Sequence, residues 1–256
     1  MTLFKSIIPP AIQKAGFDMI RHGKTDSGSV YPPDFSAENI EICKIVEPYT
    51  MTSPERVNAL INAVRYVVKN EIKGPFVECG VWKGGSSMAM ALTLIRLGAE
   101  KRSLYLYDTF SGMSAPSDAD ISIHGVPANQ RFAETKISDD ASNWCISPLE
   151  EVKRNLFNTG YEKEKVHFIK GKVEETIPKN IPKEIALLRL DTDWYESTKH
   201  ELVHLFPLLK PNGVIIIDDY GHWQGARKAV DEYISDNNIQ ILLNRIDYTG
   251  RIAVKT

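Results

Sequence analysis

The sequence lacks the features that mark secreted, membrane-spanning or zinc-binding proteins. It has three cysteines, Cys43, Cys79 and Cys145, in 256 residues. That is an odd number without metal-ligand spacing, so neither a disulfide framework nor a zinc site is expected. No apolar run approaches the ~18 residues of a membrane span, and the opening segment is too short and too interrupted for a secretory signal. We therefore expect a cytoplasmic protein with no membrane partner.

An excess of charge of either sign is also missing. The chain carries 31 basic and 33 acidic residues, for a net charge of -2. Because duplex binding is dominated by cationic surface that neutralises phosphates, nucleic acid is not an expected partner. The GxGxxG pattern of dinucleotide binders and the GxxxxGK[ST] phosphate loop are absent too. An NAD-dependent enzyme is therefore disfavoured.

The sequence does contain short apolar runs that alternate with helical patterns. The runs predict strands at 76–79, 104–107, 166–169, 185–190 and 214–217, and the patterns between them predict helices at 87–97, 148–158, 196–209 and 225–235. Strands that are apolar on both faces and alternate with helices are typical of a parallel sheet covered on both sides. Segments 239–243 and 251–254 predict an antiparallel hairpin at the sheet edge. The expected fold class is α/β, doubly wound, with a mostly parallel seven-stranded sheet.

Two segments stand apart from this alternation. Residues 1–50 include a stretch rich in Gly, Ser and Pro at 23–34, and we expect them to form an N-terminal helical arm or lid before a main domain at 51–256. That domain opens with a helix at Pro54, capped by Ser53. The segment 111–145 is longer than ordinary connections, so we expect a mobile loop that helps to close the site.

Polar residues follow the first two predicted strands, where ligands of open α/β sheets bind. Glycines after the first strand allow close approach to the backbone, and the acidic Glu78 before them suits a ligand amino group or hydroxyl. Asp108 ends the second strand, in place to accept hydrogen bonds from ribose hydroxyls. Together they favour a nucleoside without a polyphosphate, such as S-adenosylmethionine, although a tight turn and a helix cap explain each feature alone. The residues assigned to this site are Glu78, Gly80, Ser86, Ser87, Asp108, Thr109 and Gly171.

Four carboxylates follow the next two strands of the predicted sheet. Asp191 and Asp193 end one strand, and Asp218 and Asp219 end the other. Such a cluster is repulsive unless it is neutralised, and oxygen-rich sites suit Mg²⁺ or Mn²⁺. Helix caps or solvated turns explain any one of these residues but not all four. We also expect Arg227, one helical turn away, to brace the aspartate pair.

The segments ECGVWKGGSS, YDTFSGM, LRLDTDWYEST and DDYGHWQGARKAVDEY resemble the macrocin O-methyltransferase family over about residues 50–256. The resemblance implies the class I methyltransferase fold, S-adenosylmethionine, magnesium, and methylation of sugar hydroxyls on small molecules. It places the metal on Asp191, Asp218 and Asp219, and the general base on Asp193, with Asp191 as the alternative base. The chain differs from the family pattern at Thr192, where glycine is expected, and this difference predicts an altered local turn.

Several alternatives stay open at this point. A catechol-type O-methyltransferase acting on a phenol uses a similar trio of acids, so the metal site does not discriminate against it. A non-catalytic module that binds S-adenosylmethionine is a second alternative, which the complete acidic cluster disfavours. The expected partner is a small glycoside or sugar, and a homodimer is left open.

Overall fold

The structure is a computed structural model that describes residues 31–139 and 141–256. The chain divides into two compact units, Met1–Phe35 and Ser36–Thr256. Most of the first unit lies outside the described residues, and with it most of the predicted arm at 1–50. The second unit already contains residues 36–50, because helix α2 (Ala37–Val46) packs on helices of the main body. All further description concerns this second unit.

A seven-stranded sheet forms the centre of the unit, in the order β5-β2-β1-β6-β7-β9-β8. The pairs among β5, β2, β1, β6 and β7 are parallel, and β9 is antiparallel to both β7 and β8. This confirms the predicted α/β class and the mostly parallel sheet. The strands are β1 (Phe76–Cys79), β2 (Leu104–Asp108), β5 (Val166–Lys170), β6 (Ile185–Leu190), β7 (Leu209–Ile217), β8 (Asn244–Arg245) and β9 (Arg251–Val254).

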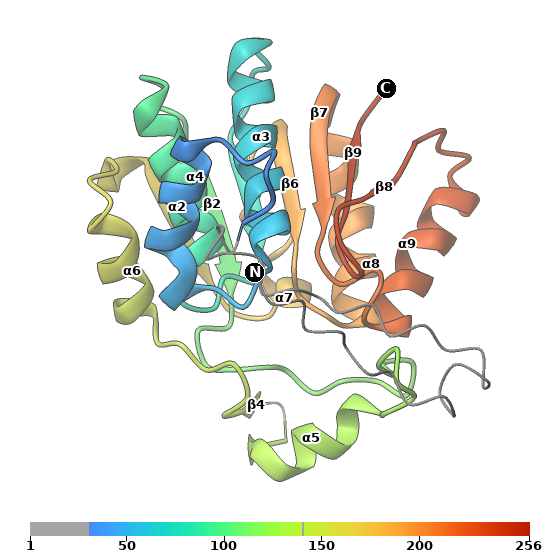
Figure 1. The fold of residues 1–256 in the computed structure, drawn as a ribbon. Helices are drawn as coiled ribbons and strands as arrows, with labels where there is room; N and C mark the ends of the chain where they lie inside the picture. The colour runs from blue at the N-terminus through green and yellow to red at the C-terminus, as the bar shows by residue number, and fades with distance from the viewer. Residues whose placement is uncertain (1–30, 140) are drawn as a thin grey trace, which may run out of the picture. The chain divides into compact units, whose positions relative to one another are not determined.

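Helices cover both faces of this sheet, with α3 and α4 on one face and α8 and α9 on the other (Figure 1). As expected, α3 begins at Pro54 and the Ser53 side chain accepts a hydrogen bond from the Arg56 N–H. The helices of the main body are α3 (Pro54–Lys69), α4 (Gly85–Arg96), α6 (Leu149–Phe157), α7 (Val173–Thr176), α8 (Tyr195–Leu205) and α9 (Gln224–Asp236), with 3₁₀ turns η1 (Glu47–Tyr49), η2 (Lys163–Lys165) and η3 (Phe206–Leu208).

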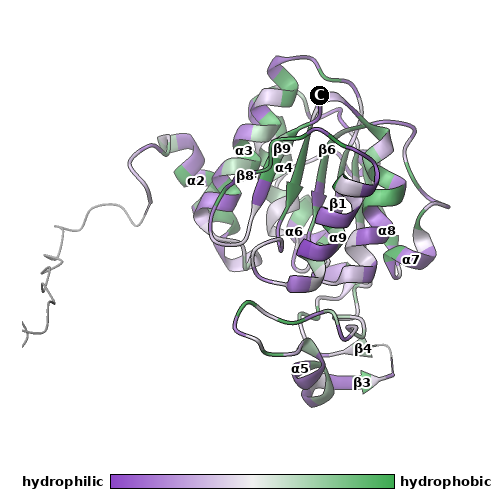
Figure 2. Ribbon diagram, turned by 90° about the vertical axis from the view of Figure 1, so that its right-hand side faces the viewer, coloured by the Kyte–Doolittle hydropathy of each residue, from purple (hydrophilic) through white to green (hydrophobic). Residues whose placement is uncertain are grey.

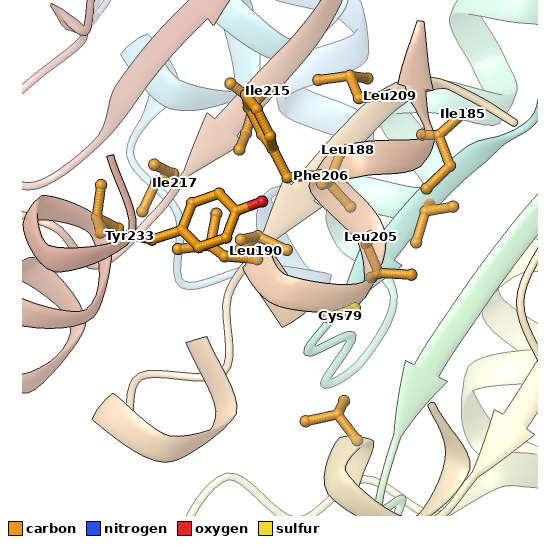
Figure 3. Packing of buried hydrophobic residues seen from close by; sticks show 14 of the residues in the cluster. Cys79, Ile185, Leu188, Leu190, Leu205, Phe206, Leu209, Ile215, Ile217 and Tyr233 are labelled. Atoms are coloured by element: carbon orange, nitrogen blue, oxygen red, sulfur yellow. The ribbon is translucent and has the colours of Figure 1, made fainter. Parts of the chain in front are cut away.

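The core between the sheet and the α8–α9 layer is apolar and closely packed. Figure 3 shows Leu188, Leu190, Ile215 and Ile217 of the strands against side chains of the helices, among them Tyr233. Burying such side chains stabilises a domain by about 1.5–3 kcal/mol each. This packing holds the strands in place, and the carboxyl ends of the parallel strands carry the polar residues of the predicted site.

The segment 111–145 is more ordered than the predicted loop. It contains helix α5 (Ala128–Thr135) and a two-stranded antiparallel sheet of β3 (Lys136–Ser138) and β4 (Ala141–Ser142). Figure 2 shows these elements below the main sheet, beyond the carboxyl ends of its parallel strands. We call residues 111–145 the roof segment. Its predicted mobility without ligand remains a prediction.

The C-terminal hairpin is confirmed as antiparallel, but its first strand is shorter and later than predicted. Residues 239–243 form no strand, and β8 covers only Asn244–Arg245. Ile239, Ile241 and Leu243 pack against the main core instead. Within residues 31–139 and 141–256, no helix combines the length and hydrophobicity that crossing a membrane requires.

Candidate active site

A pocket of about 300 Å³ opens at the carboxyl ends of the central parallel strands. It brings together residues that the sequence places more than a hundred positions apart. On one side lie five of the residues assigned to cofactor binding, Gly80, Ser86, Asp108, Thr109 and Gly171. On the other lie the four aspartates after β6 and β7, Asp191, Asp193, Asp218 and Asp219.

Gly80 is required by the close approach of β1 to β6. Its φ is +82°, a conformation that favours glycine. A Cβ atom there would overlap the Asp191 carbonyl oxygen. The Asp191 N–H donates to the Cys79 carbonyl at 2.8 Å, so the two strand ends remain hydrogen-bonded at this point. The glycine therefore sets the distance between the cofactor side and the acidic side of the pocket.

Asp108 holds the turn after β1 through its carboxylate. Oδ2 accepts hydrogen bonds from the backbone N–H groups of Val81 at 2.7 Å and Trp82 at 3.1 Å, and Oδ1 accepts one from Phe110 at 2.6 Å. Burial raises the pKa of Asp108, and these backbone bonds oppose the rise. Asp108 thereby fixes the backbone between β1 and α4.

Glu78 and Ser87 lie behind the pocket wall rather than on it. Glu78 is 1% exposed, its register partner on β6 is Arg189, and the two side chains pair at 2.8 Å. The Ser87 hydroxyl donates to the other Glu78 oxygen. The sequence predicts a ligand cation for Glu78, whereas the cation that pairs with it in the structure is Arg189. Cofactor contact by Glu78 or Ser87 therefore gains no support from the geometry.

Arg189 connects this buried pair to the acidic cluster. Its Nη1 lies 2.7 Å from Asp191 Oδ2, and its Nη2 lies 2.6 Å from Asp218 Oδ1. Burial lowers the pKa of Arg189, but the charges of Asp191, Asp218 and Glu78 outweigh it and raise that pKa well above its ordinary value. The arginine is therefore a permanent positive charge under the site.

Asp218 is paired a second time, with Arg56 from the first turn of α3. Arg56 Nε also binds Asp247 Oδ2 at 2.9 Å, and the Ser53 hydroxyl donates to the same oxygen at 2.8 Å. Asp247 precedes the turn between β8 and β9. The α3 helix, the end of β7 and the C-terminal hairpin are thereby joined at the Arg56 guanidinium.

Asp193 lies at the edge of the pocket, and the Trp223 indole N–H donates to its Oδ1 at 2.7 Å. Burial, reinforced by the charge of Asp191, raises the pKa of Asp193 to about 7, while bonds to Asp219 and Trp223 oppose the rise. Burial and the charges of Asp193 and Asp218 likewise raise the pKa of Asp219 well above its ordinary value. The cluster as it stands is therefore short of positive charge.

The roof segment is anchored above these acids by Asp120, which is 1% exposed. Its Oδ1 accepts the Tyr195 N–H at 2.8 Å, at the start of α8, and its Oδ2 accepts from the Ser117 N–H and hydroxyl. A Cβ at Gly225 would overlap Asp120 Oδ1, so the glycine leaves room for this anchor. Roof residues Met113 and Trp144 then pack on a cluster that contains Trp194 and Trp223.

Comparison with known proteins identifies the family. The sequence profile described as macrocin O-methyltransferase (TylF) matches residues 43–254. The chain belongs to the macrocin O-methyltransferase family. A Streptomyces olivaceus protein named 8-demethyl-8-(2,3-dimethoxy-alpha-L-rhamnosyl)-tetracenomycin-C 4'-O-methyltransferase is 34% identical over 203 residues, covering 79% of this chain and 74% of the relative. Mycinamicin III 3''-O-methyltransferase of Micromonospora griseorubida is 30% identical over 202 residues, covering 79% of this chain and 76% of the relative.

A solved structure agrees with this family assignment. The O-methyltransferase NovP is 30% identical, superposes with a TM-score of 0.70, and the match covers 81% of this chain and 82% of NovP. The chain is therefore an S-adenosylmethionine-dependent O-methyltransferase with the class I fold. A non-catalytic module, left open by the sequence, is not favoured by these similarities.

The residues of this macrocin-type methyltransferase fit a divalent cation. Asp191, Asp218 and Asp219 each offer an oxygen, and these atoms lie within 4.8 Å of one another. Asp219 Oδ2 is buried and has no hydrogen-bond partner among the described residues. An orphaned buried carboxylate oxygen is costly, and carboxylates are the ligands that Mg²⁺ prefers. The donor set therefore suits magnesium or manganese.

Several site residues escaped the sequence analysis. Arg189 had a visible signal, since it is a single charge inside the otherwise apolar run of β6. Arg56 and Asp247 had none, because their pairing joins distant segments. The prediction for Arg227 is wrong: its Nε donates to the Tyr220 carbonyl at 3.3 Å, and Arg56 takes the expected place beside Asp218. Arg227 lies in the first turn of α9, and its guanidinium lies over the Tyr220 ring.

Proposed function

We propose that this enzyme transfers a methyl group from S-adenosylmethionine to a hydroxyl of a sugar or of a glycosylated small molecule, with Mg²⁺ or Mn²⁺ as a second cofactor. In this proposal Asp191, Asp218 and Asp219 hold the cation, and Asp193 accepts the proton of the hydroxyl. The observation that carries it is the convergence of these four acids at one side of a single pocket.

The acceptor class is supported by the relatives. The Streptomyces olivaceus protein is named for a substrate that carries a rhamnosyl group, and it is 34% identical to this chain. The pocket also has polar and aromatic walls suited to a glycoside, with His222, Tyr248 and Trp144 beside the acids. A phenolic acceptor, the catechol-type alternative, has no comparable support from these relatives.

The donor half of the pocket is formed by the turn after β1 and the ends of β2 and β5. Gly80 and Gly171 line this half, and Asp108 fixes the turn. When bound, S-adenosylmethionine supplies an electrophilic methyl on a sulfonium, and the cation supplies charge that stabilises a developing alkoxide. The protein's own task is to position the acceptor and to remove its proton.

Asp193 is placed for that proton transfer. Its carboxylate borders the pocket, and the bond from the Trp223 indole N–H fixes the direction of Oδ1. Asp191 is a weaker candidate, because it pairs with the positive charge of Arg189 at 2.7 Å and is one of the three proposed cation ligands. This difference favours Asp193 over Asp191 as the base.

Replacing Asp219 with Asn tests the metal half. We expect a higher magnesium requirement together with lower activity, because a neutral amide oxygen holds the cation less tightly. Magnesium binding is followed by calorimetry, and turnover is followed with labelled S-adenosylmethionine and a panel of glycosides and catechols. Asp236→Asn, at the exposed end of α9, is the control. Full activity in excess chelator would contradict the metal site.

Replacing Asp193 with Asn tests the base. We expect turnover to fall by ~10²–10⁴-fold, the usual share of a general base, while magnesium and S-adenosylmethionine bind nearly as before. The measurement is kcat beside the two dissociation constants. An Asp193→Asn enzyme with normal turnover would make Asp191 the preferred base.

The panel of acceptors tests the substrate class. If the unmodified enzyme methylates catechols and no glycoside, the phenolic alternative would be favoured instead.

A further inference from the structure

Asp193 occupies an unusual backbone position. Its φ is +68°, and the Trp194 N–H donates to the Thr192 carbonyl at 2.8 Å across it. This is a γ-turn with the central residue on the left-handed side, a conformation that is rare and strained. A side chain carried by such a turn keeps its direction only if the surrounding structure holds the turn in place.

Thr192, where the family pattern has glycine, is the first residue of this turn. The left-handed residue is Asp193 and not Thr192, so a threonine fits its position without the freedom of glycine. Unlike glycine, Thr192 has a hydroxyl, and this hydroxyl donates to Glu201 Oε1 at 2.9 Å. The residue that departs from the family pattern is therefore the one that anchors the turn from its N-terminal side.

The burial of the Glu201 carboxyl is energetically unfavourable. Glu201 lies on α8, is 0% exposed, and is next to Leu202 of the apolar core. Its second oxygen, Oε2, is buried and has no hydrogen-bond partner among the described residues. A buried carboxyl that is only half satisfied destabilises a fold compared with an apolar side chain. The Cys79 thiol also lies beside this carboxyl, but Thr192 is the contact that links Glu201 to the turn at Asp193.

We infer that Glu201 is a positioning residue that acts through the Thr192 hydroxyl to hold Asp193 toward the acceptor. The inference rests on the proposed role of Asp193 as the base. The other side of the turn is already fixed, since Asp120 binds the Tyr195 N–H and Trp223 binds the Asp193 carboxylate. The Thr192–Glu201 bond completes the set by holding the residue before Asp193.

The test compares side chains that keep or lose this bond. Thr192→Val removes the hydroxyl at nearly constant volume, and we expect kcat to fall between about 10- and 100-fold, as for other displaced catalytic groups. KM for S-adenosylmethionine and the magnesium affinity should stay unchanged. Thr192→Ser restores the hydroxyl and should recover most of the lost turnover. Thr93→Val removes a buried hydroxyl bond inside α4 and serves as the control with unchanged kcat.

Glu201 provides a second and independent arm. Glu201→Gln keeps an oxygen that accepts the Thr192 bond, and it should retain far more turnover than Glu201→Leu. Glu201→Leu should lower kcat while the melting temperature stays equal or rises, because an apolar side chain replaces a half-satisfied carboxyl. A merely structural residue would show the opposite pattern, with lower stability and unchanged kcat.

A double variant shows whether the effect passes through Asp193. In the Asp193→Asn background, Thr192→Val should cause no further loss of kcat, since the group it positions has been removed. Losses that multiply, or a Thr192→Val enzyme with normal kcat beside a slow Asp193→Asn enzyme, would overturn the inference and leave the proposed function standing. A fully active Asp193→Asn enzyme would overturn the proposed base itself.

Discussion

Arg189 is a single residue on which three carboxylates depend. It is 2% exposed and lies within hydrogen-bond distance of Glu78, Asp191 and Asp218. Of these, Glu78 is also almost fully buried and has no other cation beside it in the described chain. Removing one partner of a buried ion pair leaves an uncompensated charge, which is more harmful than removing both.

Replacing Arg189 with Met should therefore lower the free energy of unfolding by about 3–5 kcal/mol. The double variant Glu78→Gln/Arg189→Met should lose less, because the glutamine removes the stranded charge. Urea unfolding of both variants at neutral pH without divalent cations measures the difference. Equal losses in the two variants would mean that Glu78 does not need Arg189.

The elements around the pocket depend on contacts that cross between them. Asp120 is the clearest case, since it ties the roof segment to the first N–H of α8 and to Ser117. A side chain that satisfies a free helix N–H contributes about 0.5–2 kcal/mol. Asp120 is one of several contacts that hold the roof segment, together with the bond from the Trp194 indole to the Ser114 carbonyl and the bridge between Ser122 and Trp223. Most of the surface of α5 and β3 is exposed.

Asp120→Ala should release this anchor. We expect faster proteolysis within residues 114–127 and a raised KM for the acceptor, because Met113 and Trp144 lose their support. The dissociation constant for S-adenosylmethionine should change little. Asp118→Ala, an exposed residue of the same segment, is the matched control. Unchanged proteolysis and KM in Asp120→Ala would show that other contacts hold the roof.

The sequence predicted the elements whose residues share one environment. The runs of β1 and β6 are buried along their whole length, as are the last five residues of β7, so their composition alone indicates parallel strands. Strand β5 lies at the sheet edge and is partly exposed, yet its apolar run was still long enough to be found. Strand β8 escaped because residues 239–243 are apolar for packing on the core and not for pairing. The order inside the roof segment also escaped, since α5 and β3 are short and largely exposed.

The candidate site, like the fold, could be predicted only in part. The acids that follow strands could be found, because their place in the chain fixes their place at the sheet edge. Their partners could not, since the bond between Arg56 and Asp218 joins residues of α3 and β7 that no local pattern relates. Glu201 gave no signal either, because an acidic residue on a helix is ordinarily solvent-exposed.

For the whole molecule, these buried acids set how stability depends on pH. Burial raises the pKa of Glu201 well above its ordinary value of 4.5, even though the Thr192 bond opposes the rise. The folded protein thus keeps a proton that the unfolded chain releases. Such a group contributes stability that is present below the unfolded pKa and is lost as the pH rises toward the folded pKa, at about 1.4 kcal/mol per pH unit.

With divalent cations removed, the enzyme should therefore lose stability as the pH rises above about 4.5, the ordinary pKa of a glutamate. Glu201→Gln should flatten this slope, because an amide has no proton to lose. Urea unfolding at several pH values in the presence of chelator measures the slope. The exposed Glu164→Gln variant is the control. An identical slope in Glu201→Gln and the unmodified protein would contradict a raised pKa at Glu201.

The pairing of Arg56 with both Asp218 and Asp247 also affects the order in which the site is assembled during protein synthesis. Arg56 and Asp247 are 191 positions apart, so during synthesis the arginine leaves the ribosome long before its second partner exists. The strands from β1 to β7 precede Asp247 in the chain, so they can pair before this contact is possible. Tyr248 and Thr249 of the hairpin connection line the pocket, so the pocket is complete only when the C-terminal hairpin has docked. The site is therefore among the last parts of the molecule to be assembled as the chain is made.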